Sequence, residues 1–500
     1  MKKIAFAGTD GRTLLSALTV ATATSENSTE TYEGIVVRGT PAMPIVADEL
    51  NWPVRFIPTA SNHVNDYAAS IIDAMQKNEI DLLVPMPEAL LFEGLVDRVK
   101  EVGFENRILG LSKEAAFVEG DKIRCKELCR EGGVPVADEW VKVDAKNKEE
   151  VIRICLDYLH RFGGAVLKYP YSAGGKGARI ITSTWDVSET ITDLVNDYKE
   201  AYTEAFGKKG VWPLLIESRM AGVEISFTIL ADSNGCFQIL PTAMDYPERF
   251  AGPPGKSNPI TGGVGAISPH PMETPALLKM AADTIAAPLV NILKKKGYLR
   301  PCILYPGCFV SLDHEGNPTA IRVAEVNIRP GEPEAQPVMR RLRNLGDLLM
   351  ATIENRLDQV IPEVREDQIA ANIALVTGPG GPDGQKGYPW RCTKGEKVEI
   401  DFGYLKKKGI QLIVSAMTTD EGVLKSDGTR VAFLNANATV KETETPGVIG
   451  ERLHQKLMAA FEQGKIRVIP RENEKGNRLD VRRDIALQYQ MKEALYPRKK

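Results

Sequence analysis

Cysteine and histidine are scarce in this 500-residue sequence, and neither is arranged as a ligand set. The seven cysteines have no CxxC spacing and their number is odd, so the sequence does not predict a disulfide framework. We predict reduced, mostly buried thiols and a cytoplasmic protein. The five histidines are scattered along the chain, which argues against a zinc site.

The sequence also lacks a charge excess and a long apolar run. A formal net charge of −3 gives no polyelectrolyte argument for nucleic-acid binding. No apolar run approaches the roughly 20 residues that cross a bilayer, and the start MKKIAFAGTDGR turns too early for a signal peptide. We therefore expect small-molecule substrates, no nucleic-acid or membrane partner, and a monomer or homodimer.

What the sequence does have is length for three or four domains, at about 100–200 residues each. Residues 1–105 alternate strands and helices, which is typical of a parallel sheet covered on both faces. Within them we predict strands at 3–7, 34–37 and 81–84, and helices at 13–23, 65–77 and 92–102. The later segments are a strand-rich core, with helices near 274–295 and 342–357, and a strand-rich end with many turns. The predicted domains are 1–105, a connector at 106–120, a lid at 121–213, a core at 214–362 and a C-terminal domain at 363–500.

A glycine turn, residues 8–12, follows the first predicted strand. A helix that begins after such a turn presents N–H groups and a positive dipole end, which favour a phosphate at Gly11 with Arg12 as a clamp. A plain structural turn is the alternative. Pro87 and Glu88 follow a later strand at the same sheet edge, where open α/β sheets bind ligands. Glu88 is therefore a candidate for binding sugar hydroxyls, or an exposed loop carboxylate.

A strand lysine precedes a glycine loop in the segment VLKYPYSAGGKGA, residues 166–178. Lys168 closes the apolar strand, and the loop contains Gly174, Gly175, Lys176 and Gly177. Glycines let a backbone close over phosphates while lysines supply charge. The spacing differs from the GxxxxGK[ST] of a Walker A loop. A hairpin with surface lysines is the alternative interpretation.

An apolar strand at 214–218 runs into a short linker, after which an acidic residue opens a new strand. This arrangement suits an adenine ring held at a hinge near Glu217 and Met220, with Glu224 on the ribose hydroxyls. An edge strand with two solvated glutamates is the alternative.

The strongest pattern is the strand that ends in AEVNIRPGEPE, residues 324–334. A strand period of two places Glu325 and Asn327 on the same face. Two neighbouring oxygen ligands, completed by phosphates and water, suit Mg²⁺. Arg329 continues that face and would pair with a transferred phosphoryl group or a carboxylate. We therefore predict a metal site here.

A second glycine turn stands in NPITGGVGAISP, residues 258–269. The backbone N–H groups of Gly262 and Gly263 and the hydroxyl of Thr261 are candidates for holding a carboxylate or an acyl phosphate. A plain loop is the alternative.

The order of these motifs resembles the glycinamide ribonucleotide synthetase family nearly end to end. That order is glycine–arginine turn, PE loop, EGxK, K…GGKG, IE…GxE, TGGxGAxSP and ExNxRxGxPExQ. The family's acidic–Asn–Arg signature is similar to Glu325, Asn327, Arg329, Gly331, Pro333, Glu334 and Gln336. The start of its ATP-grasp unit is similar to residues 119–122, and its last domain to residues 428–430 and 482–485.

The resemblance implies an α/β and α+β multidomain fold: a Rossmann-like pre-ATP-grasp domain, a two-lobed ATP-grasp unit and a small β-rich C-terminal domain. It also implies ATP-dependent ligation of glycine to 5-phosphoribosylamine through a glycyl phosphate, with Mg²⁺ or Mn²⁺. In that assignment Glu325 and Asn327 hold the metal, Arg329 and residues 261–263 stabilise the acyl phosphate, and Glu334 joins the substrate site. The phosphates of ATP lie against Lys122, Lys168 and Lys176.

Three segments depart from the family pattern: residues 245–257, Pro85 and residues 415–418. They leave open a paralogous ATP-grasp ligase with a different acid or amine. A nucleotide-binding protein without catalysis is a second alternative, which the intact lysines and Glu325–Asn327 pair disfavour. A Rossmann oxidoreductase is not expected, because the first turn lacks G-x-G-x-x-G and Arg38, not an acid, follows the second strand.

Overall fold

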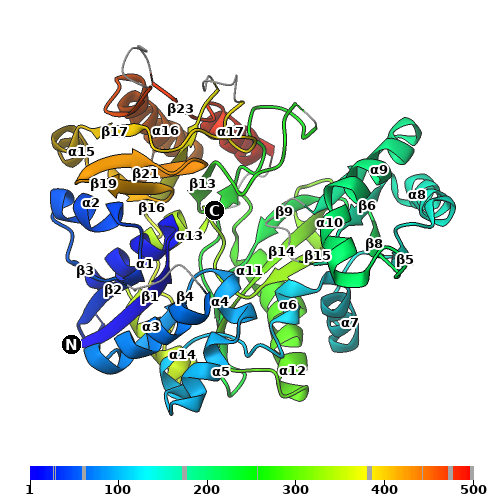
Figure 1. Cartoon of the computed structure of the whole chain (residues 1–500), viewed down its shortest axis with the longest axis horizontal. Helices are drawn as coiled ribbons and strands as arrows, with labels where there is room; N and C mark the ends of the chain where they lie inside the picture. The colour runs from blue at the N-terminus through cyan, green and yellow to red at the C-terminus, as the bar shows by residue number, and fades with distance from the viewer. Residues whose placement is uncertain are drawn as a thin grey trace.

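The computed structural model describes residues 1–25, 27–28, 30–58, 64–171, 177–255, 257–379, 386–441, 443–470 and 477–495. Figure 1 shows the N-terminal domain in blue with the C-terminal domain above it in orange and red, and a lid projecting to the right. The mixed helix and sheet architecture confirms the predicted fold class. All seven cysteines are free, and five of them are buried, as the sequence predicted.

The N-terminal domain is a parallel four-stranded sheet in the order β3-β2-β1-β4. Its elements are β1 Lys2–Gly8, α1 Gly11–Ala21, β2 Tyr32–Arg38, α2 Ala42–Leu50, β3 Val54–Ile57, α3 Val64–Asn78, β4 Leu82–Pro85, α4 Glu88–Phe92 and α5 Leu95–Glu101. The predicted alternation is confirmed. The sequence analysis missed α2, β3 and all but the last residue of α4, and its helix at 92–102 corresponds to α5, which Gly94 separates from α4 with a φ of +79°.

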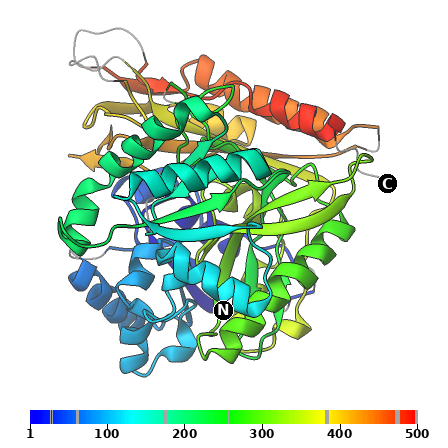
Figure 2. The same ribbon diagram turned by 90° about the vertical axis from the view of Figure 1, so that its right-hand side faces the viewer.

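The lid is an antiparallel sheet in the order β5-β8-β6-β7, which α8 and α9 cover. Its elements are β5 Trp140–Asp144, α8 Lys148–Phe162, β6 Ala165–Lys168, β7 Ala178–Ile181, the 3₁₀ turn η2 Thr184–Asp186, α9 Val187–Asp197, α10 Lys199–Phe206 and β8 Pro213–Ser218. The lid has an apolar core of its own, and it faces the viewer in Figure 2. Because β8 completes this sheet, the lid extends past the predicted boundary at 213.

The core sheet has the order β11-β10-β14-β15, and β9 also pairs with β14, on the edge opposite β15. Its elements are β9 Val223–Ser226, β10 Ile229–Ala231, β11 Phe237–Ile239, α11 Pro275–Ala281, the π-helix η3 Ala282–Ala286, α12 Ala287–Lys295, β14 Cys302–Leu312, β15 Pro318–Asn327, α13 Ala335–Arg340, α14 Leu345–Ile353 and the 3₁₀ turn η4 Leu357–Gln359. The connector holds the 3₁₀ turn η1 Glu105–Arg107 and α6 Phe117–Gly120. The next helix, α7 Lys122–Gly132, packs on α12 and β15 and so belongs with the core, although we predicted it in the lid.

The continuous helix Pro275–Lys295 is long and apolar enough to cross a membrane by length and composition, with a mean hydropathy of 1.5. This corrects the expectation that no segment approaches that length. Its buried side chains lie in the core cluster against the sheet, which is the usual setting of a core helix in a globular protein. The buried residues along it include Leu277, Ala281, Ile285, Leu289 and Ile292.

The C-terminal domain combines a sheet in the order β12-β13-β16-β21-β18, with β23 on β16, and a smaller sheet in the order β19-β20-β17-β22. Its elements are β12 Met244–Asp245, β13 Gly265–Ser268, β16 Gln368–Thr377, β17 Lys397–Ile400, α15 Phe402–Lys408, β18 Gln411–Val414, β19 Met417–Asp420, β20 Val423–Ser426, β21 Arg430–Thr439, α16 Pro446–Glu462, β22 Ile466–Ile469, β23 Leu479–Asp480 and α17 Ile485–Leu495. The predicted β-rich domain thus also carries three helices. Strands β12 and β13 come from the predicted core segment, so this sheet contains strands from both sides of the predicted boundary at 362.

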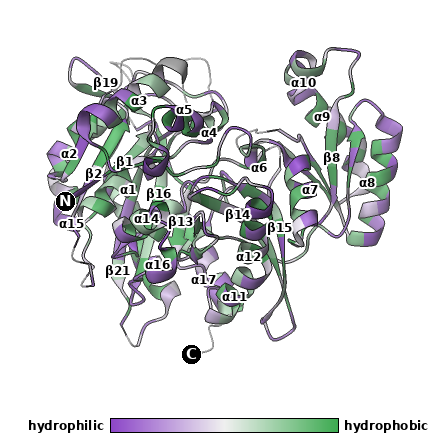
Figure 3. Cartoon of the chain, turned by 90° about the horizontal axis from the view of Figure 1, so that it is seen from below, coloured by the Kyte–Doolittle hydropathy of each residue, from purple (hydrophilic) through white to green (hydrophobic). Residues whose placement is uncertain are grey.

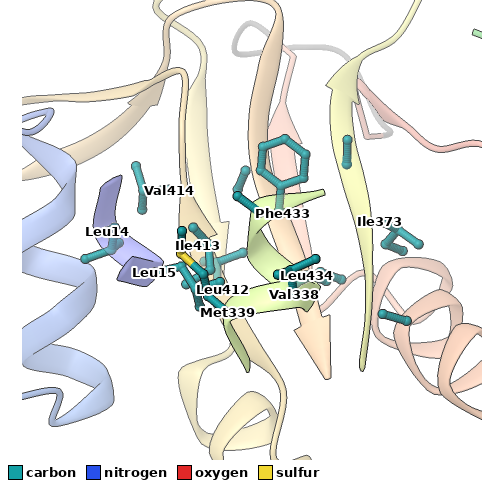
Figure 4. Packing of buried hydrophobic residues seen from close by; sticks show 14 of the residues in the cluster. Leu14, Leu15, Val338, Met339, Ile373, Leu412, Ile413, Val414, Phe433 and Leu434 are labelled. Atoms are coloured by element: carbon teal, nitrogen blue, oxygen red, sulfur yellow. The ribbon is translucent and has the colours of Figure 1, made fainter. Parts of the chain in front are cut away.

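Apolar packing joins the N-terminal domain to the C-terminal sheet. Figure 4 shows Leu14 and Leu15 of α1 beside Met339 of α13 and Leu412 of β18, all members of one buried cluster. Figure 3 shows apolar colour along the strands and polar colour on the outer sides of many helices. This shared core fixes α1 against the segment that follows β15.

Candidate active site

The end of β15 carries the predicted metal ligands on its open face. Gly307 of β14 pairs with Glu325, whereas the next residue, Cys308, pairs with Val323, so Ala324 is an extra residue in the strand. Before it, residues 321 and 323 are buried, and after it residues 326 and 328 are buried. Glu325 is therefore exposed and Asn327 half-buried, on the same face, as the sequence predicted.

The oxygens of these two side chains are accessible to a cation. Asn327 Nδ2 donates to the carbonyl of Tyr305 at 3.3 Å, and Asn327 Oδ1 accepts a long 3.4 Å bond from Arg329 Nη2. Within the described part of the chain, Glu325 forms no ion pair. A carboxylate and an amide oxygen on adjacent positions of one face suit a hard divalent cation.

A buried ionic cluster binds the lid to the core directly behind this strand. Glu217 of β8 lies 2.5 Å from Lys168 Nζ of β6 and also pairs with Lys126 of α7. The same two ammonium groups donate to β15, Lys168 to the Ala324 carbonyl at 3.0 Å and Lys126 to the Val323 carbonyl at 3.1 Å. Glu217, which we predicted near the adenine ring, is 1% exposed, and its carboxylate pairs with these two lysines.

The charges of this cluster stabilise one another. Burial opposes ionisation of Glu217, but the two lysines outweigh it and lower the pKa of the carboxyl. Burial also opposes the charge of Lys168, yet Glu217 and Glu325 raise its pKa. The sequence analysis missed Lys126, although it lies one helical turn after Lys122 on the same face of α7.

Lys122 and the glycine loop flank the same end of the lid. Burial lowers the pKa of Lys122 while Glu325 opposes that shift, so Lys122 lies within electrostatic reach of the predicted metal ligand. Its Nζ donates to the Tyr171 carbonyl at 3.2 Å. Gly177 accepts a 2.8 Å bond from the Tyr169 amide, whereas the predicted nucleotide contacts Gly174, Gly175 and Lys176 lie outside the described residues.

The hinge between β8 and β9 leads into an acidic group. Met220 is half-buried in the linker, and Glu224 opens β9 opposite Phe309 of β14. The acidic group comprises Glu224, Asp245, Glu248, Glu325 and Glu334. Glu224 reaches solvent, yet the surrounding protein raises its pKa to about 7 through desolvation and then through the charge of Glu325.

The acidic group has few cations of its own. Burial raises the pKa of Asp245 well above its usual range, and Glu334 and Glu224 add to that shift. Lys492 of α17 lowers the pKa of both Glu224 and Asp245, and Arg482 pairs with Glu248 at 3.1 Å. Such an excess of negative charge favours a divalent cation or a substrate ammonium group. The described residues hold no cluster of three or more His, Cys, Asp or Glu side chains in metal-binding geometry, so Glu325 and Asn327 would need phosphate and water oxygens to complete a shell.

Arg329 is held by carboxylates from two other segments. Its Nε lies 3.3 Å from Glu88 of α4, and its Nη2 lies 3.1 Å from Glu119 of α6. Glu119 also accepts a 2.8 Å bond from the Ile328 amide. Burial opposes the charge of Arg329, but Glu119 and Glu88 raise its pKa. Glu88, which we predicted to bind sugar hydroxyls, therefore fixes Arg329 in this structure, while Pro87 is half-buried just before it.

We expect Arg329→Lys to lower turnover by about 10²–10³-fold, the range for removing an oriented donor from a developing charge. Lysine keeps the charge but cannot span Glu88 and Glu119 with a planar fork. Arg322→Lys is the matched control, because Arg322 lies on β15 and pairs with Asp138 in a half-exposed position. Steady-state rates of the two variants, with circular dichroism for the fold, would check this; equal rates would remove Arg329 from the site.

The Thr-Gly-Gly turn uses its polar groups internally. The Gly262 amide donates to the Tyr388 hydroxyl at 3.1 Å, and the Gly263 amide donates to Thr261 Oγ1 at 3.1 Å. The Thr261 hydroxyl donates to the Pro247 carbonyl at 2.8 Å. Arg430 binds the Gly262 and Gly263 carbonyls. Stabilisation of an acyl phosphate by these N–H groups would require exchange of these partners, and it stays a prediction.

We expect Gly263→Ala to lower the free energy of unfolding by about 2–4 kcal/mol, from positive-φ strain and overpacking together. Gly263 has a φ of +86°, and a Cβ there would lie 2.2 Å from Pro333 Cδ. Gly252→Ala is the control, because its φ is +103° but nothing lies within 4 Å of its Cβ position. Urea unfolding of both variants separates strain from collision; equal losses would show that the Pro333 contact is unimportant.

The N-terminus of α1 already holds the carboxyl group of Glu332, whose pKa is raised to about 7 by burial. The Arg12 amide donates to Glu332 Oε2 at 3.0 Å, and Asp10 caps the helix through the Thr13 amide. The Arg12 guanidinium is buried, where it binds Asp10 at 2.9 Å and the Pro330 carbonyl. A Cβ on Gly11 would meet the side chains of Gln336 and Glu332. The predicted binding of a substrate phosphate by Gly11 and Arg12 would therefore need Glu332 to move away.

Two cavities lie away from these residues. The larger, about 790 Å³, lies behind the lid between β5, α8, η3 and β15 and includes Trp140 and Arg322. The smaller, about 170 Å³, lies between α1 and the C-terminal sheet. Neither is lined by a residue that the sequence predicted for the site, so position along β15 and not cavity size identifies the candidate active site.

A protein-family match covers the part of the chain that contains the lid and β15. Residues 120–335 match the family described as phosphoribosylglycinamide synthetase, ATP-grasp (A) domain. The chain is 29% identical over 398 residues to the phosphoribosylamine–glycine ligase of Escherichia coli O157:H7, covering 77% of this chain and 83% of that protein. It is 30% identical over 332 residues to the bifunctional purine biosynthetic protein PUR2,5 of Pichia angusta, covering 66% of this chain. The chain spans only 38% of that bifunctional relative and 40% of another from Saccharomyces cerevisiae.

Solved structures share the fold. The phosphoribosylamine–glycine ligase of Thermotoga maritima aligns with a TM-score of 0.67 at 20% identity, covering 96% of this chain and 99% of that chain. Biotin carboxylase of Campylobacter jejuni aligns with a TM-score of 0.61 at 14% identity, covering 97% of this chain and 94% of that chain. These likenesses show that the chain shares the fold of these enzymes, and the description as ATP-grasp comes from the family match over residues 120–335.

Proposed function

We propose that the chain joins the carboxylate of glycine to the amine of 5-phosphoribosylamine at the expense of ATP, and the match of residues 120–335 to the phosphoribosylglycinamide synthetase ATP-grasp model supports this. The products would be glycinamide ribonucleotide, ADP and phosphate, in purine biosynthesis. Relatives named phosphoribosylamine–glycine ligase support the substrates, and the ATP-grasp fold supports the reaction class.

One observation carries the proposal: the Glu325–Asn327 face of β15 lies beside the lysines that connect the lid to the core. Lys168 donates to the carbonyl of the residue before Glu325, and the negative charge of Glu325 acts to raise the pKa of Lys122. The lysines would therefore bind the triphosphate of ATP, and Glu325 and Asn327 would bind the divalent cation next to it. A structural sheet edge would not need this arrangement.

The reaction has two steps. A carboxylate oxygen of glycine attacks the γ-phosphorus and ADP leaves, after which the amine attacks the acyl carbon, loses a proton and displaces phosphate. A loose phosphoryl-transfer transition state needs charge neutralisation and positioning more than a protein nucleophile. Lys122 and Lys168 would bind phosphate oxygens, and Arg329, oriented by Glu88 and Glu119, would face the transferred group.

The residues present fit a divalent cation, because two oxygen donors share the open face of β15 within an acidic group that raises the pKa of Glu224 and Asp245. We propose Mg²⁺, or Mn²⁺, held by Glu325 and Asn327; when bound, it would neutralise phosphate charge. The carboxyl group of Glu224 would accept hydrogen bonds from the ribose hydroxyls of ATP. The acidic group would attract the ammonium group of glycine.

The test is ADP release from purified protein with Mg–ATP, glycine and freshly made 5-phosphoribosylamine, with mass spectrometry of the product. Glycinamide ribonucleotide formed in step with ADP is the expected result. Omission of each substrate in turn controls for uncoupled hydrolysis.

Other acids and amines distinguish the remaining possibilities. Turnover with another amino acid but not glycine would favour a paralogous ligase, for which the departures at 245–257 give a physical reason. Binding of ATP without turnover for any pair would contradict the ligase proposal.

A further inference from the structure

The smaller cavity lies at the far end of α1 from the candidate active site. It is lined by the second half of α1, including Thr19 and Thr22, and by Arg340, Arg365, Gln411 and Asn437. Because α1 has 11 residues, its two ends are about 16 Å apart. The cavity therefore lies away from the Gly11 turn, beside the packing of Leu15 and Met339 in Figure 4.

Two arginines line this cavity without a carboxylate partner in the described part of the chain. Arg340 Nη2 donates to Asn437 Oδ1 at 2.6 Å, but its buried Nε has no partner among the described groups. Arg365 donates to Thr24 Oγ1 at 2.6 Å and, more weakly, to the Leu342 carbonyl at 3.5 Å. The three hydrogen-bond partners of these arginines are neutral groups, so no negative charge among the described residues pairs with either guanidinium group.

The surroundings increase the positive charge. Burial lowers the pKa of Arg340 to about 10, and the charge of Arg365 adds to that shift. Burial, Arg340 and Lys408 likewise lower the pKa of Lys456. Among the neighbours of Arg365, Arg343 lowers its pKa and the exposed Asp367 opposes that effect. Like charges held together in a partly buried space disfavour the empty state.

We propose that this cavity is a second anion site, which binds a phosphate group through the paired guanidinium groups of Arg340 and Arg365. The planar fork of arginine matches the oxygens of phosphate, and charge-assisted bonds would satisfy the vacant Nε. The cavity volume of about 170 Å³ is below the roughly 300–1,000 Å³ of typical ligand pockets. An anion of a few heavy atoms, free or at the end of a sugar phosphate, therefore fits.

One feature of the fold opposes an anion here. The C-terminal end of α1 carries about half a negative charge from its carbonyl dipoles, and Thr22 lies at that end. Two full positive charges, those of Arg340 and Arg365, outweigh this half charge. Gln411 has a buried Oε1 without a partner among the described groups, and rotation of its amide would present Nε2 as a further donor.

Calorimetric titration of the full chain with inorganic phosphate, under saturating Mg–ADP at constant ionic strength, tests the proposal. Wild-type protein should show a phosphate site that weakens at least about tenfold in Arg340→Gln and in Arg365→Gln. Lys408→Gln removes an exposed nearby charge that does not line the cavity, and should leave this site unchanged. Thermal unfolding without phosphate provides a second readout, since relief of arginine repulsion should leave both variants at least as stable as wild type.

The ligand and the alternatives are separated by the same titration. Tighter binding of ribose 5-phosphate than of phosphate would identify a sugar phosphate, and equal binding would identify free phosphate. A phosphate affinity that is the same in all four proteins, or no phosphate site besides that of the nucleotide, would overturn the proposal. Should Arg340→Gln fail to fold, Arg365→Gln, whose side chain is half-exposed, decides the outcome.

Discussion

Glu325→Ala is expected to lower ATP-dependent product formation by at least about 100-fold, or ~2.7 kcal/mol of transition-state stabilisation. Glu325 is exposed on β15, so its removal leaves no cavity and the chain should remain folded. The loss would come from the missing carboxylate oxygen of the proposed cation site and from weaker orientation of the phosphates near Lys122. Nucleotide affinity without metal should change much less than turnover.

The measurement is steady-state ADP release at saturating ATP over a range of Mg²⁺ concentrations. Glu127→Ala is the control, because Glu127 is exposed on α7 close to Lys126 but plays no part in the proposed site. If turnover of Glu325→Ala stayed within about tenfold of wild type, at most ~1.4 kcal/mol, the metal assignment would be wrong. Recovery of activity at high Mg²⁺ would instead support it.

Glu217→Gln should produce the largest loss of stability, about 3–5 kcal/mol, because it leaves two buried ammonium groups without a carboxylate. Lys126 and Lys168 are 4% and 8% exposed at their side chains, so water cannot replace Glu217. The lid should loosen first, since the cluster joins β6 and β8 to α7 and β15. Urea unfolding followed by circular dichroism measures the loss.

The effect should depend on pH with a definite sign. Since the folded-state pKa of Glu217 is lowered, its contribution is complete above its unfolded pKa and disappears as pH falls through the folded value. The difference between wild type and Glu217→Gln should therefore shrink in acid. Glu139→Gln is the control: its pair with Arg161 is exposed to solvent, and such pairs contribute little to the free energy of unfolding. A Glu217→Gln loss no larger than that of Glu139→Gln would contradict a stabilising cluster.

Local patterns of the sequence predicted much of the architecture. The strands and helices of residues 1–105 follow from apolar runs separated by turn residues. The shared face of Glu325 and Asn327 followed from strand periodicity alone. Helix α2 was missed because Pro44 stands inside it, although a proline in the first turn of a helix costs little.

The partners of the site residues could not be predicted in the same way. Nothing near Glu88 in the sequence indicates that it meets Arg329, because that contact depends on how the N-terminal domain docks on the core. The occupation of the α1 N-terminus by Glu332 is likewise a tertiary contact. Lys126 was within reach of sequence analysis, since its spacing from Lys122 is that of one helical face.

The extra residue in β15 has a consequence for how this protein tolerates changes of length. Shortening the strand by Ala324 would restore its regular pleat with residues 323 and 326 still buried, so the carboxylate of Glu325 and the amide of Asn327 would keep the open face. The same deletion would take away the carbonyl to which Lys168 donates. A single-residue gap there would thus leave the proposed cation ligands on their face but weaken the attachment of the lid, whereas the turn at Glu315 between β14 and β15 is solvent-exposed and can vary in length.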